Sequence, residues 1–213
     1  MRILLFDLDG CLVDSTVPIS ESLDQALVGR GLEPIAGEFI DRFIGPPMRV
    51  TLAGLLRDRD RLDVDVDELI DDYRKHYASA SLANAVSYPG VPEMLADLAG
   101  DHRIGVVTSK PAIFAAPIVE ALGFSRYLEF VEGPDGEAEP KSATLGRAVD
   151  RHRAPPGTVM IGDRRHDIEA GRAHDLATVG VTWGFGTRDE LEDAGADAIV
   201  DKPREIRPVL AGW

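Results

Sequence analysis

Two carboxylates, Asp7 and Asp9, follow directly on the first apolar run of the chain, which extends from Ile3 to Phe6. A short apolar run predicts a buried strand, and open α/β sheets carry their chemistry at the carboxyl ends of such strands. Alternate residues of an extended chain point to opposite sides, so the two carboxylates share one pocket only if the backbone bends between them. Gly10 supplies the freedom for that bend. The pattern predicts a catalytic acidic site, or alternatively an ordinary acidic turn.

Further along the chain, other candidate strands and helices carry polar residues suited to phosphoryl chemistry. Residues 103–107 end at Thr108, residues 159–162 end at Asp163, and Lys141 opens a predicted helix between them. The carboxyl ends of parallel strands meet at one edge of a sheet, so we expect these side chains to gather near Asp7. The occurrence of all these residues at the ends of predicted strands or the start of a predicted helix favours a catalytic site over an isolated turn.

The second part of the chain alternates between helical and strand-like patterns. Strand-like runs occur at 103–107, 128–131, 157–161 and 176–182. Alternation of this kind predicts an α/β fold with a doubly wound parallel sheet, a Rossmann-like core with helices on both faces and right-handed crossovers. The first strand must join this sheet from the other end of the sequence.

The segment from residue 15 to residue 85 has helical periodicity and no convincing strand. One apolar face is formed by Ile19, Leu23, Ala26 and Leu27, and a second by Phe39, Ile40, Phe43 and Ile44. Two further helices are predicted from Met48 to Arg57 and from Val66 to Leu82. We therefore expect an α/β core made of residues 1–14 and 86–213, and a small helical domain inserted at residues 15–85.

Four aspartates that converge at the strand ends would repel one another. Two carboxylates about 5 Å apart repel by about 3 kcal/mol at an effective dielectric constant near 20. A divalent cation removes this penalty, and hard oxygen ligands favour Mg²⁺. We expect the ligands to be the carboxylates of Asp7 and Asp163 and the backbone carbonyl of Asp9. Asp167, four residues after Asp163, would lie on the same helical face and hold a metal-bound water or Lys141.

These motifs, in this order, resemble the four motifs of the haloacid dehalogenase-like hydrolase superfamily. The matching stretches are Phe-Asp-Leu-Asp-Gly from residue 6, Val-Thr-Ser-Lys-Pro from residue 107, Lys141, and Ile-Gly-Asp-Arg-Arg-His-Asp-Ile from residue 161. The sequence looks closest to the phosphoglycolate phosphatase and bacterial 5′-nucleotidase-like branch. The stretch from Gly180 to Asp197 particularly resembles the latter. The resemblance implies that the helical insertion is a cap that closes over the pocket.

Each matching residue can be given a role in phosphate ester hydrolysis. Asp7 would be the nucleophile that forms an aspartyl-phosphate, and Asp9 the general acid and base. Thr108 would donate its hydroxyl to a phosphoryl oxygen, and Lys141 would place a compact positive charge between Asp7 and the transferring group. The expected reaction is Mg²⁺-dependent hydrolysis of a small phosphorylated metabolite, of the phosphoglycolate or nucleoside 5′-monophosphate type.

Additional substrate contacts are predicted around these residues. Gly10, Ser109 and Lys110 would bind the phosphate group. Arg49, at the start of a predicted helix of the insertion, would reach a second anionic group of the substrate, although solvation at a helix start explains an arginine there equally well. Trp183 would line the rim of the pocket or pack beneath it.

The net charge of −14, from 37 acidic and 23 basic residues, opposes binding to nucleic acid and to anionic lipid. The apolar run at the N-terminus is too short for a signal peptide or a membrane span. The single cysteine, Cys11, excludes an internal disulfide and agrees with a reducing compartment. We therefore expect a cytoplasmic monomer or homodimer whose partner is a small phosphate ester.

Two other classes of protein share parts of this pattern. A phosphomutase or a dehalogenase would have the same fold with a different acceptor or substrate. A signalling receiver domain also phosphorylates an aspartate beside a threonine and a lysine, but it is usually shorter and carries that aspartate on a middle strand. Asp7 on the first strand argues against the signalling domain.

Overall fold

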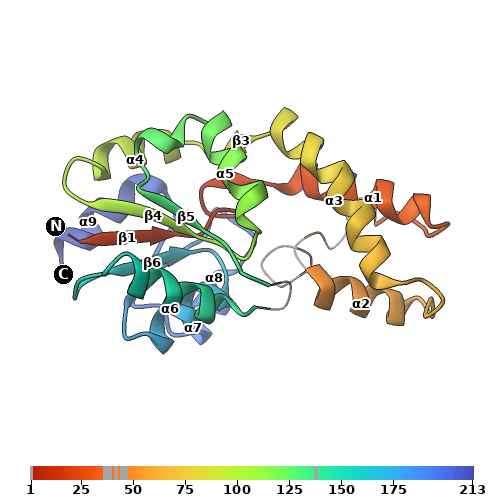
Figure 1. Cartoon of the computed structure of the whole chain (residues 1–213). Helices are drawn as coiled ribbons and strands as arrows, with labels where there is room; N and C mark the ends of the chain where they lie inside the picture. The colour runs from red at the N-terminus through yellow and green to blue at the C-terminus, as the bar shows by residue number, and fades with distance from the viewer. Residues whose placement is uncertain (1, 36–39, 41–42, 44–47, 137–138) are drawn as a thin grey trace.

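The computed structural model of the chain describes residues 2–35, 40, 43, 48–136 and 139–213. A six-stranded, fully parallel sheet has the strand order β5-β4-β1-β6-β7-β8 (Figure 1). Its strands are β1 (Ile3–Phe6), β4 (Arg103–Val107), β5 (Phe130–Glu132), β6 (Val159–Gly162), β7 (Ala177–Val181) and β8 (Ala198–Val200). The predicted doubly wound α/β fold is confirmed, and β1 lies at its centre.

Helices cover both faces of this sheet (Figure 1). They are α4 (Val91–Leu98), α5 (Ala112–Ala121), α6 (Lys141–Arg151), α7 (Arg165–Ala173), α8 (Arg188–Asp193) and α9 (Ile206–Ala211), with 3₁₀ turns η2 (Phe124–Arg126) and η3 (Pro203–Glu205). Side chains of β1 alternate between the faces: Leu4 and Phe6 pack in the cluster that contains α4 and α5, and Ile3 and Leu5 in the cluster that contains α6 and α7. This double burial explains why β1 reads as a continuous apolar run.

Between β1 and α4 the described part of the chain forms a short ribbon and three helices. The ribbon pairs β2 (Val13–Asp14) antiparallel with β3 (Val86–Ser87). The helices are α1 (Thr16–Gly29), α2 (Met48–Asp58) and α3 (Val66–Ala83), and they lie at one end of the sheet (Figure 1). The helix predicted from residues 39–44 lies mostly outside the described residues. The helices predicted near residues 48–57 and 66–82 are present.

Helix α3 shows how the sequence sets a helix in this segment. The carboxylate of Asp65 accepts hydrogen bonds from the backbone N–H groups of Asp67 and Glu68, so it caps the amino end. Buried residues then recur at helical spacing along one side: Leu69, Ile70, Tyr73, Tyr77 and Ser81. This side packs against α1 and α5.

The strand predictions at the sheet edges were less accurate. The strand predicted at 128–131 begins later, because its pairing starts where Phe130 lies opposite Gly105. A Cβ atom at Gly105 would stand 2.3 Å from the Phe130 ring, so the missing side chain makes room for it. Strand β8 was not predicted, since three residues after a turn give too short a pattern.

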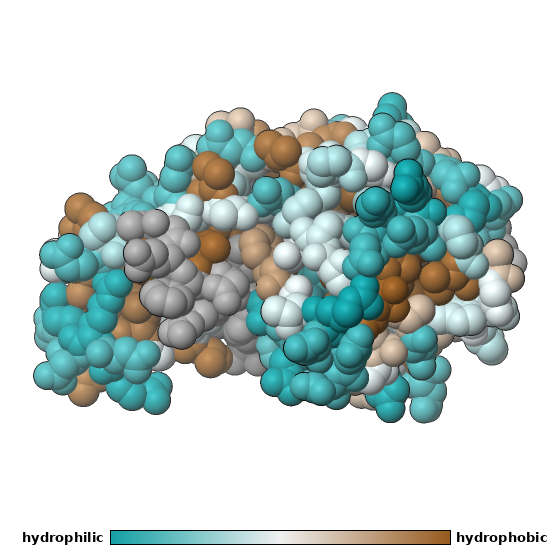
Figure 2. Space-filling model, turned by 180° about the vertical axis from the view of Figure 1, so that it is seen from behind, coloured by the Kyte–Doolittle hydropathy of each residue, from teal (hydrophilic) through white to brown (hydrophobic). Residues whose placement is uncertain are grey.

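The molecular surface agrees with the charge-rich composition. Seen from behind, hydrophilic side chains cover much of the face, with smaller hydrophobic areas between them (Figure 2). None of the helices in the described residues combines the length and the apolar character needed to cross a membrane.

Candidate active site

The loop after β1 is a tight turn that starts beside Asp7 and carries Asp9. The carbonyl of Leu8 accepts hydrogen bonds from the N–H groups of Leu12 and Val13, both at 2.9 Å. Gly10 occupies the left-handed region with φ of 83°, and a Cβ there would stand 2.2 Å from Asp163 Oδ2. Only glycine satisfies both the dihedral angle and the close approach. The bend predicted from Gly10 is therefore present.

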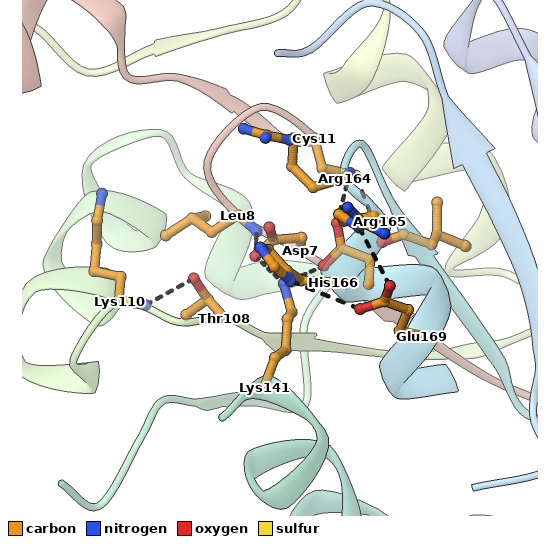
Figure 3. Close-up of polar contacts among 12 residues, drawn as sticks. Asp7, Leu8, Cys11, Thr108, Lys110, Lys141, Arg164, Arg165, His166 and Glu169 are labelled. Carbon is orange, nitrogen blue, oxygen red and sulfur yellow. Dashed lines mark hydrogen bonds and ion pairs between the residues drawn. The ribbon is translucent and has the colours of Figure 1, made fainter. Parts of the chain in front are cut away.

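Three buried carboxylates meet at the carboxyl edge of the sheet. Asp7 follows β1, Asp163 follows β6, and Asp167 lies in the first turn of α7. Ligand oxygens of the three lie within 4.8 Å of one another. Lys141, the first residue of α6, points toward Asp7 (Figure 3), with its Nζ 2.8 Å from Asp7 Oδ1. The Nζ also contacts Asp167 Oδ1, so it bridges two of the three carboxylates.

Burial dominates the electrostatics of this cluster. Desolvation raises the pKa of the Asp7 carboxyl to about 7, against the opposing attraction of Lys141. Desolvation, and then the charge of Asp167, raise the pKa of Asp163 well above its usual value. Burial lowers the pKa of Lys141, but Asp167 and Asp7 outweigh it, so the net shift is upward and the side chain stays an ammonium ion. The single positive charge of Lys141 therefore does not balance the negative charge that the three carboxylates carry when ionised.

The donor set fits a divalent cation. Asp163 Oδ2 accepts a hydrogen bond from the N–H of Phe185 at 2.8 Å, whereas the buried Oδ1 has no hydrogen-bond partner among the described residues. Buried polar atoms are nearly always satisfied, so this oxygen indicates a missing positive partner. The group consists of the carboxylates of Asp7, Asp163 and Asp167, and carboxylate oxygens favour a hard ion.

Asp167 reaches the cluster by a different route from the one predicted. Asp163 precedes α7 and lies in the turn after β6, so the two residues do not share a helical face. Asp167 instead stands at the third position of the helix, and its Oδ2 accepts a hydrogen bond from the N–H of Arg164 at 2.9 Å. This capping contact turns the Asp167 carboxylate back toward Lys141.

The segment after β4 supplies the other predicted phosphate ligands. Thr108 is buried, and its Oγ1 accepts a hydrogen bond from the N–H of Lys110 at 3.1 Å (Figure 3). Strand β4 pairs directly with β1, so Thr108 follows its strand beside the strand of Asp7. Ser109 and Lys110 line a cavity that also contains Asp9. The structure thus brings these predicted residues to the same edge of the sheet.

The carboxylate of Asp9 is held by two side chains. Asp9 Oδ1 accepts a hydrogen bond from the hydroxyl of Ser15 and another from Lys110 Nζ at 2.5 Å. Lys110 Nζ also donates to the phenol oxygen of Tyr77, on α3. Sequence reasoning missed Ser15 and Tyr77. Tyr73 and Tyr77 are four residues apart in α3, a spacing that places them on one helix face but does not predict what that face contacts.

The cavity beside Asp9 lies between the sheet edge and helices α1 to α3. Its polar end is formed by Asp9, Ser109 and Lys110. Its remaining wall is largely apolar or aromatic and is formed by Ile19, Phe43, Met48, Tyr73, Arg74, Tyr77, Pro111 and Phe114. A cavity with one polar end and an apolar wall suits a ligand whose reacting group lies at one end.

Two residues considered as substrate contacts, Arg49 and Trp183, do not line this cavity, and for Trp183 a packing role was the stated alternative. Arg49 forms an ion pair with Asp67, the second residue of α3, and it is not among the described residues that line the cavity. The indole N–H of Trp183 donates a hydrogen bond to the carbonyl of Cys11 at 2.9 Å, and its ring packs against the main core cluster. The structure therefore gives Trp183 a packing role that fastens the loop after β1.

Several curated relatives are similar to this chain over most of its length. An N-acetylmuramic acid 6-phosphate phosphatase of Pseudomonas aeruginosa is 34% identical and covers 99% of this chain and 95% of its own. A 5′-nucleotidase of the same organism is 32% identical over 88% of this chain and 86% of its own. The tyrosine-protein kinase PtkA of Mycobacterium tuberculosis is 32% identical over 96% of this chain and 72% of its own.

Solved structures share the fold. A predicted phosphatase from Clostridium acetobutylicum superposes with a TM-score of 0.90 and 27% identity, over 100% of this chain and 99% of its own. The sequence model of the haloacid dehalogenase-like hydrolases matches residues 4–181, which include every residue of the acidic cluster and Lys141. The chain therefore belongs to the haloacid dehalogenase-like hydrolase family.

Proposed function

We propose that this protein hydrolyses small phosphate monoesters with Mg²⁺ through a phosphorylated Asp7. The observation that supports this most directly is the placement of Asp7. Its carboxylate lies at the end of the central strand, 2.8 Å from Lys141 and within the acidic cluster. A carboxylate nucleophile beside a cation site and a lysine suits phosphoryl transfer, in which positioning and charge stabilisation supply most of the rate.

Mg²⁺ would be held by the carboxylates of Asp7 and Asp163 and by the backbone carbonyl of Asp9. A bound divalent cation supplies positive charge that favours the ionised carboxylates and the transferring phosphoryl group. The unsatisfied Oδ1 of Asp163 supports this assignment. Asp167 would remain outside the ligand set, because its two oxygens are engaged by Lys141 and by the N–H of Arg164.

In the first half-reaction, one oxygen of Asp7 attacks phosphorus. A bond forms between this oxygen and phosphorus while the bond from phosphorus to the ester oxygen breaks. Asp9 delivers a proton to the departing ester oxygen. Lys141, a permanent ammonium, and Thr108 would donate hydrogen bonds to the phosphoryl oxygens as their charge rises.

In the second half-reaction, Asp9 removes a proton from water. The water oxygen attacks phosphorus, the bond from phosphorus to Asp7 breaks, and inorganic phosphate leaves. Asp9 then carries the proton for the next turnover. The position of Asp9 directly before Gly10, at the polar end of the cavity, supports this double role.

We further propose that residues 15–85 form a cap domain and the remainder the catalytic core. The β2–β3 ribbon stands at both ends of the inserted segment, and the cavity is lined from both sides. The leaving group of the substrate would lie in the cavity, against the wall formed by the inserted helices. Cap side chains would then set substrate choice, while the core carries the chemistry.

The relatives named as a 5′-nucleotidase and as phosphoglycolate phosphatases support a substrate class for this proposal. A small phosphorylated metabolite, of the phosphoglycolate or nucleoside 5′-monophosphate type, is the candidate. The kinase named among the relatives adds a second candidate, transfer of the phosphoryl group to a hydroxyl acceptor in place of water. Both reactions would begin with phosphorylation of Asp7.

A panel of phosphate monoesters with Mg²⁺ tests the proposal. We expect release of inorganic phosphate from alkyl and aryl esters, abolished by exhaustive chelation and restored by Mg²⁺. Rapid acid quenching with a labelled substrate should trap one phosphoryl group on Asp7, identified by peptide mass. Full activity after chelation, or a label on another residue, would contradict the proposal. Label that passes to an added hydroxyl acceptor without release of phosphate would favour the kinase-type reaction.

A further inference from the structure

One cap side chain contacts the catalytic core through a lysine. The phenol oxygen of Tyr77 accepts a hydrogen bond from Lys110 Nζ, and the same Nζ donates to Asp9 Oδ1 at 2.5 Å. The Nζ also lies 4.7 Å from the centroid of the Tyr77 ring. All three residues line the same cavity. The contact therefore joins helix α3 to the proposed general acid and base.

The surroundings hold Tyr77 firmly in place. Tyr77 is 2% exposed, its ring stacks on Tyr73 with centroids 5.3 Å apart, and the ring of Phe114 meets it edge-on at 5.9 Å. A phenol packed on two sides by aromatic rings has little rotamer freedom. Tyr77 thus offers a fixed oxygen to a flexible lysine.

A lysine ammonium such as that of Lys110 is held in one position only if a fixed acceptor, here the Tyr77 oxygen, binds it. Its four-carbon stem has considerable rotamer entropy, and its ammonium carries three N–H donors. In the described structure one donor points to Tyr77 and one to Asp9. Fixing two donors directs the third, and a ligand in the cavity is the natural acceptor.

We propose that Tyr77 is a positioning residue that holds Lys110 against Asp9, so that the acid–base group is correctly placed only with α3 docked on the core. This inference rests on the proposed phosphatase activity. Loss of the Tyr77 hydroxyl would leave the nucleophile and the acidic cluster unchanged. It would loosen Lys110 and, through it, the Asp9 carboxylate.

The position of this contact predicts a dependence on the leaving group. Alkyl phosphates need protonation of the departing oxygen, whereas p-nitrophenolate leaves without it. Tyr77→Phe should therefore lower kcat/KM about tenfold for an alkyl phosphate and less than about twofold for p-nitrophenyl phosphate. A merely structural role would lower both rates equally.

Tyr73→Phe is the matched control. Tyr73 lies one helical turn away, lines the same cavity and stacks on Tyr77, and among the hydrogen bonds of the described residues Lys110 Nζ pairs with Tyr77 and Asp9 but not with Tyr73. We expect this variant to leave the ratio of alkyl to aryl rates within about twofold of wild type. An equal shift of the ratio in both variants would overturn the proposal.

A double-mutant cycle tests whether Tyr77 acts through the lysine. In a Lys110→Met background, the added Tyr77→Phe should change either rate by less than about twofold, because coupled residues are not additive. Full additivity of the two substitutions would overturn the proposal. Unfolding midpoints of all variants, measured in parallel, separate positioning from loss of fold.

Nitrogen-detected NMR of the lysine side chains supplies a readout that needs no activity. The Lys110 ammonium, assigned by its absence in Lys110→Met, should give a protected signal in wild type that broadens in Tyr77→Phe and persists in Tyr73→Phe. An unchanged signal in Tyr77→Phe would overturn the proposal. A wild type inactive on every ester would overturn the proposed function, and the NMR comparison would still decide whether Tyr77 holds Lys110.

Discussion

The backbone N–H of Phe185 donates a hydrogen bond to Asp163 Oδ2 at 2.8 Å, while Oδ1 of the same buried carboxylate has no partner among the described residues. One oxygen is thus fixed by the protein, and the other is presented to the cluster formed with Asp7 and Asp167. A carboxylate held in this way is preorganised for a cation, because the Phe185 contact sets its orientation before binding.

Asp163→Asn should abolish the stabilisation of the protein by Mg²⁺. The amide keeps an acceptor for the N–H of Phe185 but removes the charge that the cation needs. The metal-free variant should also unfold at a higher midpoint than metal-free wild type, since burial beside Asp167 and Asp7 disfavours the Asp163 carboxylate and raises its pKa. Thermal unfolding with and without Mg²⁺ measures both effects. The exposed Asp193→Asn is the control, and an unchanged Mg²⁺ shift in Asp163→Asn would refute the ligand assignment.

The stability of the metal-free protein should decrease as pH rises. Burial raises the pKa of Asp7 to about 7, from a usual value of 3.8. A carboxyl with a raised folded-state pKa contributes stability below its unfolded pKa and loses it as pH rises through the folded value. The unfolding midpoint in chelator should therefore fall between about pH 4 and about pH 8, with much less fall in excess Mg²⁺. A slope as steep in Asp7→Asn as in wild type would assign the effect to other groups.

Asp7→Asn should remove turnover and leave the fold intact. The amide nearly preserves the volume of the carboxylate but is a poor nucleophile. Steady-state assays with p-nitrophenyl phosphate, which does not depend on Asp9 as an acid, measure the loss directly. A variant that keeps more than about a tenth of the wild-type kcat, a barrier change under ~1.4 kcal/mol, would mean that the nucleophile is another residue. Circular dichroism checks that the sheet and helices remain.

Asp9→Asn should separate the two half-reactions. Hydrolysis of alkyl phosphates should fall by about 10²- to 10⁴-fold, because their alkoxides leave poorly without a proton. With p-nitrophenyl phosphate the first half-reaction should persist and the second should slow, so a burst of p-nitrophenol should precede slow turnover. Stopped-flow absorbance and acid quenching detect the burst and the trapped phosphoenzyme. Equal losses on both esters with no burst would restrict Asp9 to a structural role.

Gly10→Ala and Gly31→Ala form a matched pair of substitutions. Comparing them separates the effect of the close contact between position 10 and Asp163 from the effect of a positive φ. Both glycines have positive φ, 83° and 66°, but a Cβ at Gly31 would meet nothing within 4 Å. Gly31→Ala should cost about 1–2 kcal/mol of stability from the backbone conformation alone. Gly10→Ala should cost a further ~1–3 kcal/mol and lose Mg²⁺ binding, because its methyl group would collide with Asp163. Denaturant titrations and Mg²⁺-dependent unfolding measure both quantities.

The sequence predicts where Asp7, Asp163, Thr108 and Lys141 lie in the fold, because each of them belongs to a local motif. Asp7 and Asp163 follow apolar runs, and parallel strands of one sheet bring such ends together whatever the side chains between them. The same argument places Thr108. Lys141 is predicted as the start of a helix, and it is the first residue of α6. These four positions depend on the topology, which the alternation of strands and helices reveals.

Contacts between the inserted helices and the core could not be predicted in this way. Ser15 and Tyr77 reach Asp9 only through the packing of α1 and α3, which depends on many side chains at once. Arg49 was expected either at the substrate or in solvent at a helix start, and the start of α3 places an acidic partner, Asp67, within its reach. Asp167 reaches the cluster through a capping contact with the N–H of Arg164, which the spacing of four residues from Asp163 does not predict.

The ribbon of β2 and β3 pairs Val13 with Ser87 and Asp14 with Val86, so the chain leaves the core and returns to it at adjacent points. Strands β1 and β4, its neighbours in the sequence, also remain neighbours in the sheet. An inserted segment whose two ends lie side by side does not change the strand order of the sheet. The entropic cost of closing such a segment grows only with the logarithm of its length. Helices between the two ribbon strands could therefore be exchanged, shortened or lengthened over evolutionary time while the hydrolytic centre keeps its geometry.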